Sequence, residues 1–349
     1  MADLKIGALF SDRDYLERGY NRVVGQDVNW QWNQYISIRA HWLHSQTTAR
    51  ANSQGELERQ QELHGSAQRI EYMFRSKRWE GTFYSERVSP DFRADNGFFG
   101  QVGYLTEFAQ LTHKLGRLGF LNELNIIVSN QDSRDWQGNI LRHGMRPALK
   151  LELGRDTSVN LEMASNEQQR VVSGGQLHAL SFVSLLINSA PSNWLPQASA
   201  RLNVGDKIDP SVDQKVKGNT LELKLAMKPQ RQFDLKVYWL KEWLKNSYAL
   251  QNTDNHWQRT SDSALQMQAN WEIDPSLNLR VVLSRGKATR NPALYEHNLE
   301  LMAFDDSLSN AFSIKKSLTS AFDVTLGVSR ARLQTGKNDA YLRFQWRLE

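Results

Sequence analysis

The chain is built from segments in which apolar and polar residues alternate with a period of two. Leu221, Leu223 and Leu225 alternate with Glu222 and Lys224, and the same pattern recurs from residues 28–32 to residues 342–348. Successive side chains of a β-strand point to opposite faces, so each segment has one apolar and one polar face. The alternation therefore predicts an all-β protein.

Two architectures satisfy this pattern. In a soluble sandwich the apolar faces form the core. In a membrane β-barrel the apolar faces turn outward to lipid and the polar faces turn inward to the lumen. Because the alternation continues through nearly all 349 residues, we expect one antiparallel transmembrane β-barrel domain over residues 1–349, with roughly 14–18 strands.

The lengths of the segments and connections favour the barrel. Segments of about 9–12 residues suit a tilted membrane strand better than the soluble mean of about 5–6. Short connections at 33–34, 228–231, 274–276 and 317–321 alternate with longer polar segments at 49–66, 205–219, 251–263 and 286–298. Short turns at one end and long loops at the other are typical of outer-membrane barrels.

Composition excludes several classes of function. The chain has no cysteine, which excludes disulfides, thiolate metal sites and cysteine nucleophiles. Its 43 basic and 38 acidic residues are interspersed, and the absence of a basic block argues against a nucleic-acid partner. No apolar run approaches the roughly 18 residues that a transmembrane helix needs.

The polar residues of the alternating segments are the candidates for a lumen lining. They carry both signs of charge, often on one strand. Such a lumen can be open to water, braced by salt bridges or plugged by a loop, and mixed charge predicts poor ion selectivity for an open pore. The candidate lumen-lining residues are Arg39, Glu71, Lys150, Glu152, Arg201, Glu222, Lys224, Asp234, Lys236, Arg280, Asp323 and Arg343.

Tryptophans near the ends of the predicted strands are candidates for the aromatic girdles of a barrel. Aromatic residues gather at both membrane interfaces, although they also prefer strands in general. The candidates are Trp42, Trp79, Trp239, Trp271 and Trp346.

No motif in the chain predicts catalysis. It has no His-Glu-x-x-His zinc motif, no glycine-rich phosphate loop and no Gly-x-Ser-x-Gly elbow. Asp305 with Asp306, and Asp91 with Asp95, offer oxygen ligands but not the spacing of a calcium loop. We therefore expect no catalytic site, cofactor or metal in this chain, and leave open whether the protein is an enzyme.

Three motifs in the first hundred residues resemble a known family. They are Gly7-Ala8-Leu9-Phe10-Ser11-Asp12-Arg13, Asn21-Arg22-Val23-Val24-Gly25-Gln26-Asp27 and Val88-Ser89-Pro90-Asp91-Phe92-Arg93-Ala94-Asp95-Asn96-Gly97-Phe98. They look like the β-barrel region, a domain of unknown function, of large bacterial outer-membrane proteins. Those proteins carry an N-terminal module similar to family 9 carbohydrate-binding domains.

The resemblance implies that this chain is the C-terminal part of a longer protein. The signal sequence, the glycan-binding-like module and the first barrel strands would then precede Met1. The family brings no established activity with it. The motif residues also fit structural roles, since Asn21 and Asp27 flank a strand start, and residues 90–97 are turn-rich. We expect the latter to form a loop folded over the rim or into the lumen.

The expected location is the outer membrane of a Gram-negative bacterium. The expected partners are its lipid bilayer, the outer-membrane assembly machinery, and glycans or proteins that bind the long loops. The final strand, with its alternating Leu342, Phe344, Trp346 and Leu348, resembles the insertion signal that this machinery reads. The functional hypothesis is a channel, transport or membrane-anchoring component linked to glycan binding. The alternative is a soluble all-β binding protein or a carbohydrate-active enzyme domain.

Overall fold

The structure, a computed structural model, contains only β-strands as regular elements in the part of the chain that it describes. The described ranges contain no helix that is long and apolar enough to cross a membrane. The described residues are 3–51, 57–96, 101–171, 174–209, 213–245, 259–289, 304–319, 322–332 and 337–346.

Within these described ranges, eighteen strands follow one another. They are β1 (Asp3–Asp14), β2 (Tyr20–Gln31), β3 (Ile36–Ala51), β4 (Leu57–Arg75), β5 (Trp79–Val88), β6 (Tyr104–Leu118), β7 (Leu121–Asp135), β8 (Ile140–Leu153), β9 (Thr157–Gln169), β10 (His178–Ser189), β11 (Gln197–Asp209), β12 (Gln214–Gln230), β13 (Phe233–Lys245), β14 (Arg259–Asp274), β15 (Leu277–Thr289), β16 (Phe304–Ser317), β17 (Phe322–Arg332) and β18 (Lys337–Trp346).

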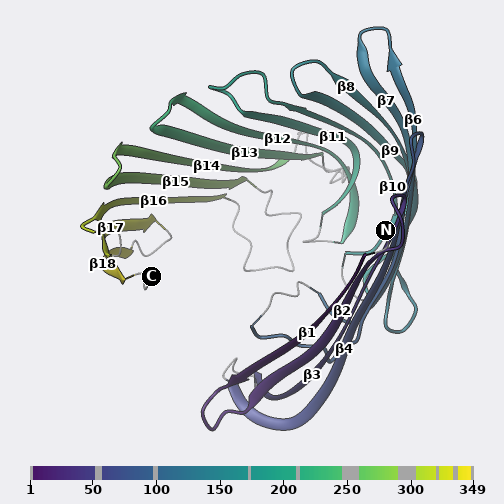
Figure 1. Ribbon diagram of the computed structural model, residues 1–349, viewed down its shortest axis with the longest axis horizontal. Coiled ribbons are helices and arrows are strands. Elements are labelled where there is room, and N and C mark those ends of the chain that lie inside the picture. Colours follow the sequence, from purple (N-terminus) through teal and green to yellow (C-terminus); the bar gives the residue numbers. More distant parts are fainter. Residues whose placement is uncertain are drawn as a thin grey trace, which may run out of the picture. The chain divides into compact units, whose positions relative to one another are not determined.

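All eighteen strands belong to one sheet, in which strands adjacent in sequence pair with each other (Figure 1). The pairing is antiparallel from β1 through β6 and from β10 through β18. An antiparallel sheet with this hairpin order is what the alternating sequence predicts. The expected all-β fold class is confirmed, at the upper end of the expected strand number.

Antiparallel neighbours place successive connections at alternate ends of the strands. The connections 32–35, 76–78, 119–120, 154–156, 231–232 and 275–276 each follow an even-numbered strand, and we call the strand ends that such connections join short-turn ends. The opposite ends, which we call long-loop ends, include those joined by the connection 89–103 between β5 and β6. The predicted tight turns at 33–34 and 274–276 are therefore confirmed, and both lie at short-turn ends.

Two of the predicted long loops are wrong. Residues 49–66 belong largely to β3 and β4, where Ser45 faces Gly65 and Thr47 faces Leu63. Residues 205–219 belong largely to β11 and β12, with Gly205 opposite Gly218. These stretches are polar on both faces, so they lack the alternation that marks a strand, yet their backbones still pair. As a result β4 reaches 19 residues.

The other two predicted loops fall partly outside the described residues. Residues 251–258 and 290–298 lie outside them. The remainders, 259–263 and 286–289, lie in β14 and β15.

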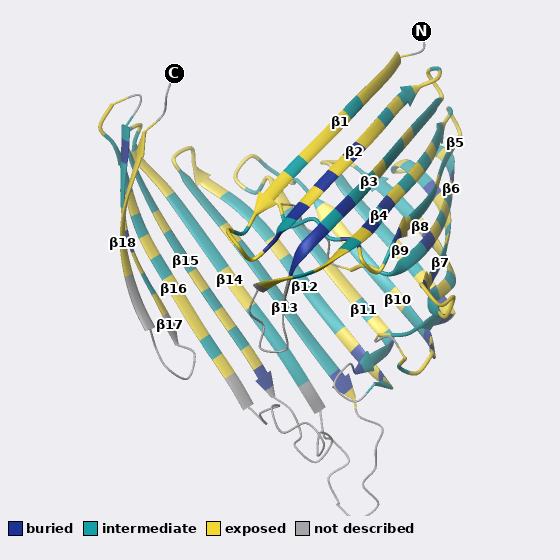
Figure 2. Cartoon of the chain, turned by 90° about the horizontal axis from the view of Figure 1, so that it is seen from below, coloured by how far each residue is buried: buried dark blue, intermediate teal, exposed yellow. Residues whose placement is uncertain are grey.

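The chain divides into two units, and the first comprises residues 1–116, 124–149 and 164–180. In this unit, register joins the apolar side chains of β1 to β4 into rows: Ile6 faces Val28, Val28 faces Ala40 and Ala40 faces Ile70. Ile6 is 72% and Ile70 52% exposed. Figure 2 colours much of β1 as exposed. These apolar side chains thus cover an outer face rather than fill a core.

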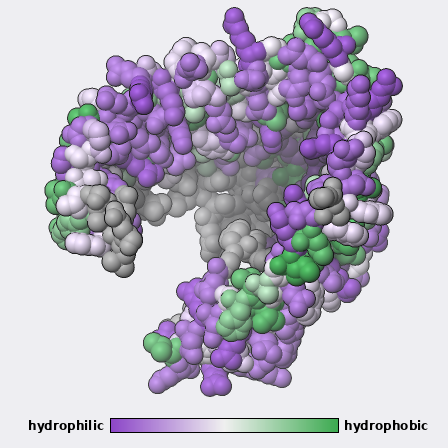
Figure 3. All heavy atoms as spheres, viewed as in Figure 1, coloured by the Kyte–Doolittle hydropathy of each residue, from purple (hydrophilic) through white to green (hydrophobic). Residues whose placement is uncertain are grey.

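The second unit comprises residues 117–123, 150–163 and 181–349. Its strands show the same arrangement, since Leu225 faces Val237, Val237 faces Met267 and Met267 faces Leu283. In the view of Figure 3, hydrophilic side chains predominate, with scattered hydrophobic patches among them. Each unit therefore has an apolar face formed mid-strand and a polar face on the opposite side.

Candidate functional site

The candidate lumen residues of the first unit lie on its polar face. Arg39 of β3 is directly opposite Glu71 of β4, each one residue away from the outer row of Ala40 and Ile70. Arg69, next along this face, lies 3.6 Å from Glu71 and 3.8 Å from Glu86 in nitrogen–oxygen distance. Opposite charges on neighbouring strands thus balance one another across this face.

The candidate lumen residues of the second unit also share one face. The register makes three direct pairs: Arg201 with Glu222, Asp234 with Asn270, and Arg280 with Asn270. Lys150 pairs with Glu152, Lys224 with Glu222, and Asp323 with Lys315. The remaining members, Lys236 and Arg343, lie opposite Gln268 and Thr325. All twelve candidates thus lie on strand faces opposite apolar rows, and their lining of a lumen stays a prediction.

The candidate girdle tryptophans all lie on the apolar face. Trp79 begins β5 and Trp346 ends β18, both at short-turn ends, and Trp271 lies near the short-turn end of β14. Trp42 is the last apolar residue on its face of β3, before His44, whereas Trp239 is followed on the same face of β13 by Lys241 and Trp243. Tryptophans on the apolar faces near strand ends are what girdles require, and that role stays a prediction.

The connection after β5 does not extend away from the strands. Residues 89–96 fold back onto the polar face of β1 to β4, in the first unit. The turn begins with a reciprocal contact, in which Ser89 N donates to the carbonyl of Ser66 and Ser66 N donates to Ser89 Oγ, both at 2.8 Å. This contact directs the chain over the sheet. The turn-rich residues 90–97 were expected to form a loop folded over the rim or into the lumen.

Phe92 attaches this segment by apolar contact. It is 3% exposed and forms a buried cluster with Ala67 and Val88, against which Leu43 and Tyr104 pack. Gly65 lies under it, because a Cβ atom there would come 2.2 Å from Phe92 Cα. Burying a phenylalanine contributes about 1.5–3 kcal/mol. The small residues Gly65 and Ala67 make room for it on a face that is otherwise polar.

Asn21 of β2 is the central polar contact of the segment. Its Nδ2 donates to Thr47 Oγ1 and to the carbonyl of Arg93, and its Oδ1 accepts from Asp95 N at 2.9 Å. Asn21 and Thr47 are both buried, so these bonds form away from water. A buried amide with three partners holds its neighbours in one arrangement, since leaving any of them unpaired is costly.

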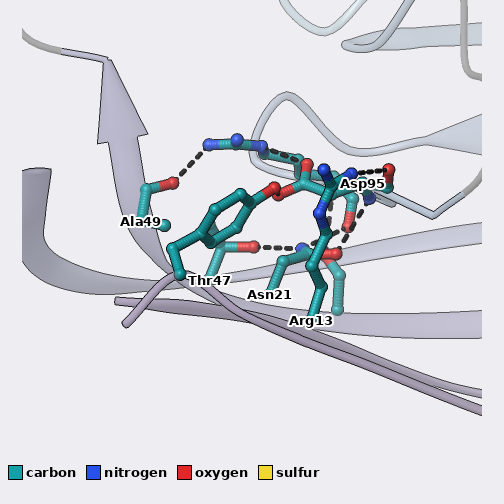
Figure 4. Close-up of polar contacts among 8 residues, drawn as sticks. Arg13, Asn21, Thr47, Ala49 and Asp95 are labelled. Carbon is teal, nitrogen blue, oxygen red and sulfur yellow. Dashed lines mark hydrogen bonds and ion pairs between the residues drawn. The ribbon is translucent and has the colours of Figure 1, made fainter. Parts of the chain in front are cut away.

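Arg93 and Asp95 complete the network, shown in Figure 4. Arg93 pairs with Asp95, and it also donates to the carbonyl of Ala49 and, through its backbone, to Ser45 Oγ. Asp95 accepts from the hydroxyl of Tyr15 at 2.6 Å, and its carbonyl accepts from Arg13 at 2.8 Å. Residues from β1, β2, β3 and the Tyr15 turn thus hold one eight-residue segment.

The Tyr15 hydroxyl is suited to remain a donor. Burial raises the pKa of Tyr15 above its ordinary value of 10.0, and the hydrogen bond to the Asp95 carboxylate raises it further. At neutral pH the hydroxyl therefore keeps its proton and the contact with Asp95 persists.

Sequence reasoning found part of this site. It assigned residues 90–97 to a loop folded over the rim or into the lumen. It placed Asn21 and Asp27 beside a strand start, which is wrong, since both lie within β2. It missed Arg93 and Asp95 as partners of Asn21, and it missed Gly65. Because residues 49–66 were predicted as a loop, the signal that a glycine gives inside a strand, close approach of another backbone, was not recognised at Gly65.

Comparison with known proteins supports the fold and no closer relationship. No protein-family model matches the chain, and no curated protein sequence does. The siderophore receptor PirA of Pseudomonas aeruginosa superposes with a TM-score of 0.52 at 8% identity, over 100% of this chain and 74% of that one. The copper transporter OprC superposes with a TM-score of 0.51 at 9% identity, over 97% of this chain and 61% of that one.

The fold is therefore that of the outer-membrane β-barrels. Its apolar strand faces are exposed, and in such a barrel these faces contact lipid. Together they place the chain in an outer membrane, as the alternating sequence predicted.

Proposed function

We propose that the protein is an outer-membrane channel for small hydrophilic solutes and that residues 89–96 narrow its lumen. The observation that carries the proposal is the attachment of this segment to the polar face, through Phe92, Arg93 and Asp95. A loop pinned against the inner face of a barrel reduces the cross-section open to solutes, so its position sets which solutes pass.

The charges on the polar faces bear on the class of solute. Ion pairs such as Arg69 with Glu86, and Lys315 with Asp323, leave both signs represented. A wall of this kind favours hydrated polar solutes and discriminates weakly between simple ions. The resemblance of the first hundred residues implies glycan-derived solutes and an accompanying carbohydrate-binding module, which we include in the proposal.

The test is a planar-bilayer recording of the purified protein beside the Asn21→Ala variant. Loss of the Asn21 contacts releases residues 89–96, so we expect a larger single-channel conductance in the variant than in the parent. Asn29→Ala provides the control, because Asn29 lies on the same face of β2 but is exposed. Absence of conductance in all three proteins would refute the channel.

A membrane anchor or scaffold is the second candidate. The observation in its favour is the length of β3 and β4, 16 and 19 residues, which continue beyond the outer rows that end near Trp42 and Ile70. A paired ribbon projecting from the membrane suits a docking role. Deleting residues 50–62 should then leave insertion intact and abolish binding of a partner or glycan; unchanged binding would refute this role for the ribbon.

A further inference from the structure

A cavity of about 450 Å³ lies beside the inward-folded segment, entirely within the first unit. It occupies the long-loop end of β6 to β9 and is bordered by Pro90 and Gly103 of the β5–β6 connection. Thr106, which lines the cavity, is directly opposite Glu86 and therefore lies on the polar face of the sheet. The hydroxyl groups of Thr106 and Ser133 are hydrogen-bonded at 2.9 Å. The cavity thus opens on the side along which a solute would travel.

Arginines dominate the charge around this cavity. Arg142 and Arg170 line it, and Arg146 joins Arg142 on the same carboxylate, that of Glu167. Asp135, the other acid, is engaged by the backbone of Gln137 and by the backbone and side chain of Asn139. Three arginines against two committed carboxylates leave an excess of positive charge.

The two lining arginines also have unused donors. Arg170 Nε is buried and has no hydrogen-bond partner among the described residues. Arg142 uses its Nε for Glu167, and its two terminal nitrogens have no partner in that part of the chain either. A buried N–H without an acceptor is costly, and a guanidinium group matches a carboxylate with two parallel bonds.

The remainder of the lining suits a flat or ring-shaped body. Trp136 and Tyr104 supply ring surfaces, and Gln131, Gln137 and Gln169 supply amides. The guanidinium of Arg87 covers Trp136 at 4.6 Å from the ring centre, which holds the indole in place. Convergent polar groups beside aromatic surfaces are the usual composition of a small-molecule site.

We propose that this cavity binds a small organic carboxylate whose body is ring-shaped, with Arg170 and Arg142 receiving the carboxylate. The site deepens the channel function and rests on it, since it would hold a solute next to the narrowed part of the lumen. The carboxylate is the shared chemistry, and the test below distinguishes a sugar body from an aromatic one.

The test is isothermal titration of the full chain in detergent with two pairs of probes: glucuronate against glucose, and benzoate against benzyl alcohol. We expect one acid of the two to bind and its neutral partner not to. Arg170→Met should weaken this binding about tenfold or more, because it removes a charge-assisted bond while keeping the apolar stem. Arg75→Met, at the short-turn end of β4, should leave it unchanged.

The binding results support or overturn the proposed carboxylate site as follows. Binding of glucuronate alone assigns a sugar acid, and binding of benzoate alone assigns an aromatic acid. Equal binding of an acid and its neutral partner, or no binding of any probe to the folded protein, overturns the proposal. A chain that conducts without binding refutes only this site, whereas a chain that binds without conducting refutes only the channel.

Discussion

Gly65 lies directly against Phe92: a Cβ atom added to this glycine would come within 2.2 Å of the Phe92 Cα atom. The contact joins a strand of the polar face to the backbone of the inward-folded segment. No flexible side chain separates them, so any larger residue at position 65 must displace the segment itself.

The first prediction follows from this contact. Gly65→Ala should detach residues 89–96 at a cost of about 1–3 kcal/mol, because overpacking forces the backbone to move. Single-channel conductance should rise. Gly81→Ala serves as the control, since a Cβ there finds its nearest atom, in Phe74, at 3.7 Å. Equal conductance in both variants would show that the segment does not narrow the path.

The second prediction concerns Asn21. Asn21→Ala leaves Thr47, the Arg93 carbonyl and the Asp95 N–H without this partner, and each unpaired buried group costs about 1–3 kcal/mol. We expect a lower midpoint of thermal unfolding in detergent and faster proteolysis within residues 89–96. Asn29→Ala should change neither. Unaltered proteolysis in Asn21→Ala would contradict the central role of Asn21.

The third prediction is a pH dependence that passes through Tyr15. Because its folded-state pKa is raised above 10.0, its contact with Asp95 is fully present below that value and is lost as pH rises through the folded pKa. The chain lacks cysteine, so a spin label on Asp91→Cys reports the segment alone. Label mobility should increase at strongly alkaline pH.

Tyr15→Phe separates this effect from general alkaline unfolding. The labelled variant should be mobile already at neutral pH and should lose the alkaline step. Tyr35→Phe, at the short-turn end, should retain it. An alkaline step that survives in Tyr15→Phe would assign the titration to another group.

The fourth prediction concerns Glu167, which is 1% exposed and pairs with both Arg142 and Arg146. Glu167→Gln leaves two arginines without their carboxylate and should destabilise the protein by about 3–5 kcal/mol. It should also shift the reversal potential in a salt gradient toward anions. Glu152→Gln removes a more exposed pair and should cost about 1 kcal/mol or less. Comparable losses in the two variants would contradict this account.

The fifth prediction tests which face meets lipid. Leu326 is 56% exposed in an outer row with Ile314 and Leu342. Leu326→Arg should lower folding stability in lipid vesicles by about 2–4 kcal/mol. Thr325→Arg, one residue away on the polar face, should be tolerated. If the two costs, measured by urea titration, are reversed, the assignment of the faces is wrong.

The strands could be predicted only where apolar and polar side chains alternate along the chain. Where one face is apolar, as from Leu221 to Leu225, the alternation locates both strand and face. Where both faces are polar, as at Ser45 to Thr47, the pattern disappears although the strand continues. Strand ends at the long-loop side were therefore misplaced, because backbone pairing there does not depend on hydrophobicity.

By itself, the sequence determined the all-β class, the antiparallel hairpin order, and the face to which Arg39, Glu71 and Trp42 belong. These properties follow from neighbours two residues apart on one strand. Only the tertiary structure decided that Phe92 lies on Gly65, that Asn21 holds Arg93 and Asp95, and that Arg170 borders a cavity. Those contacts join residues dozens of positions apart, and their geometry depends on the register and curvature of several strands, which no local pattern encodes.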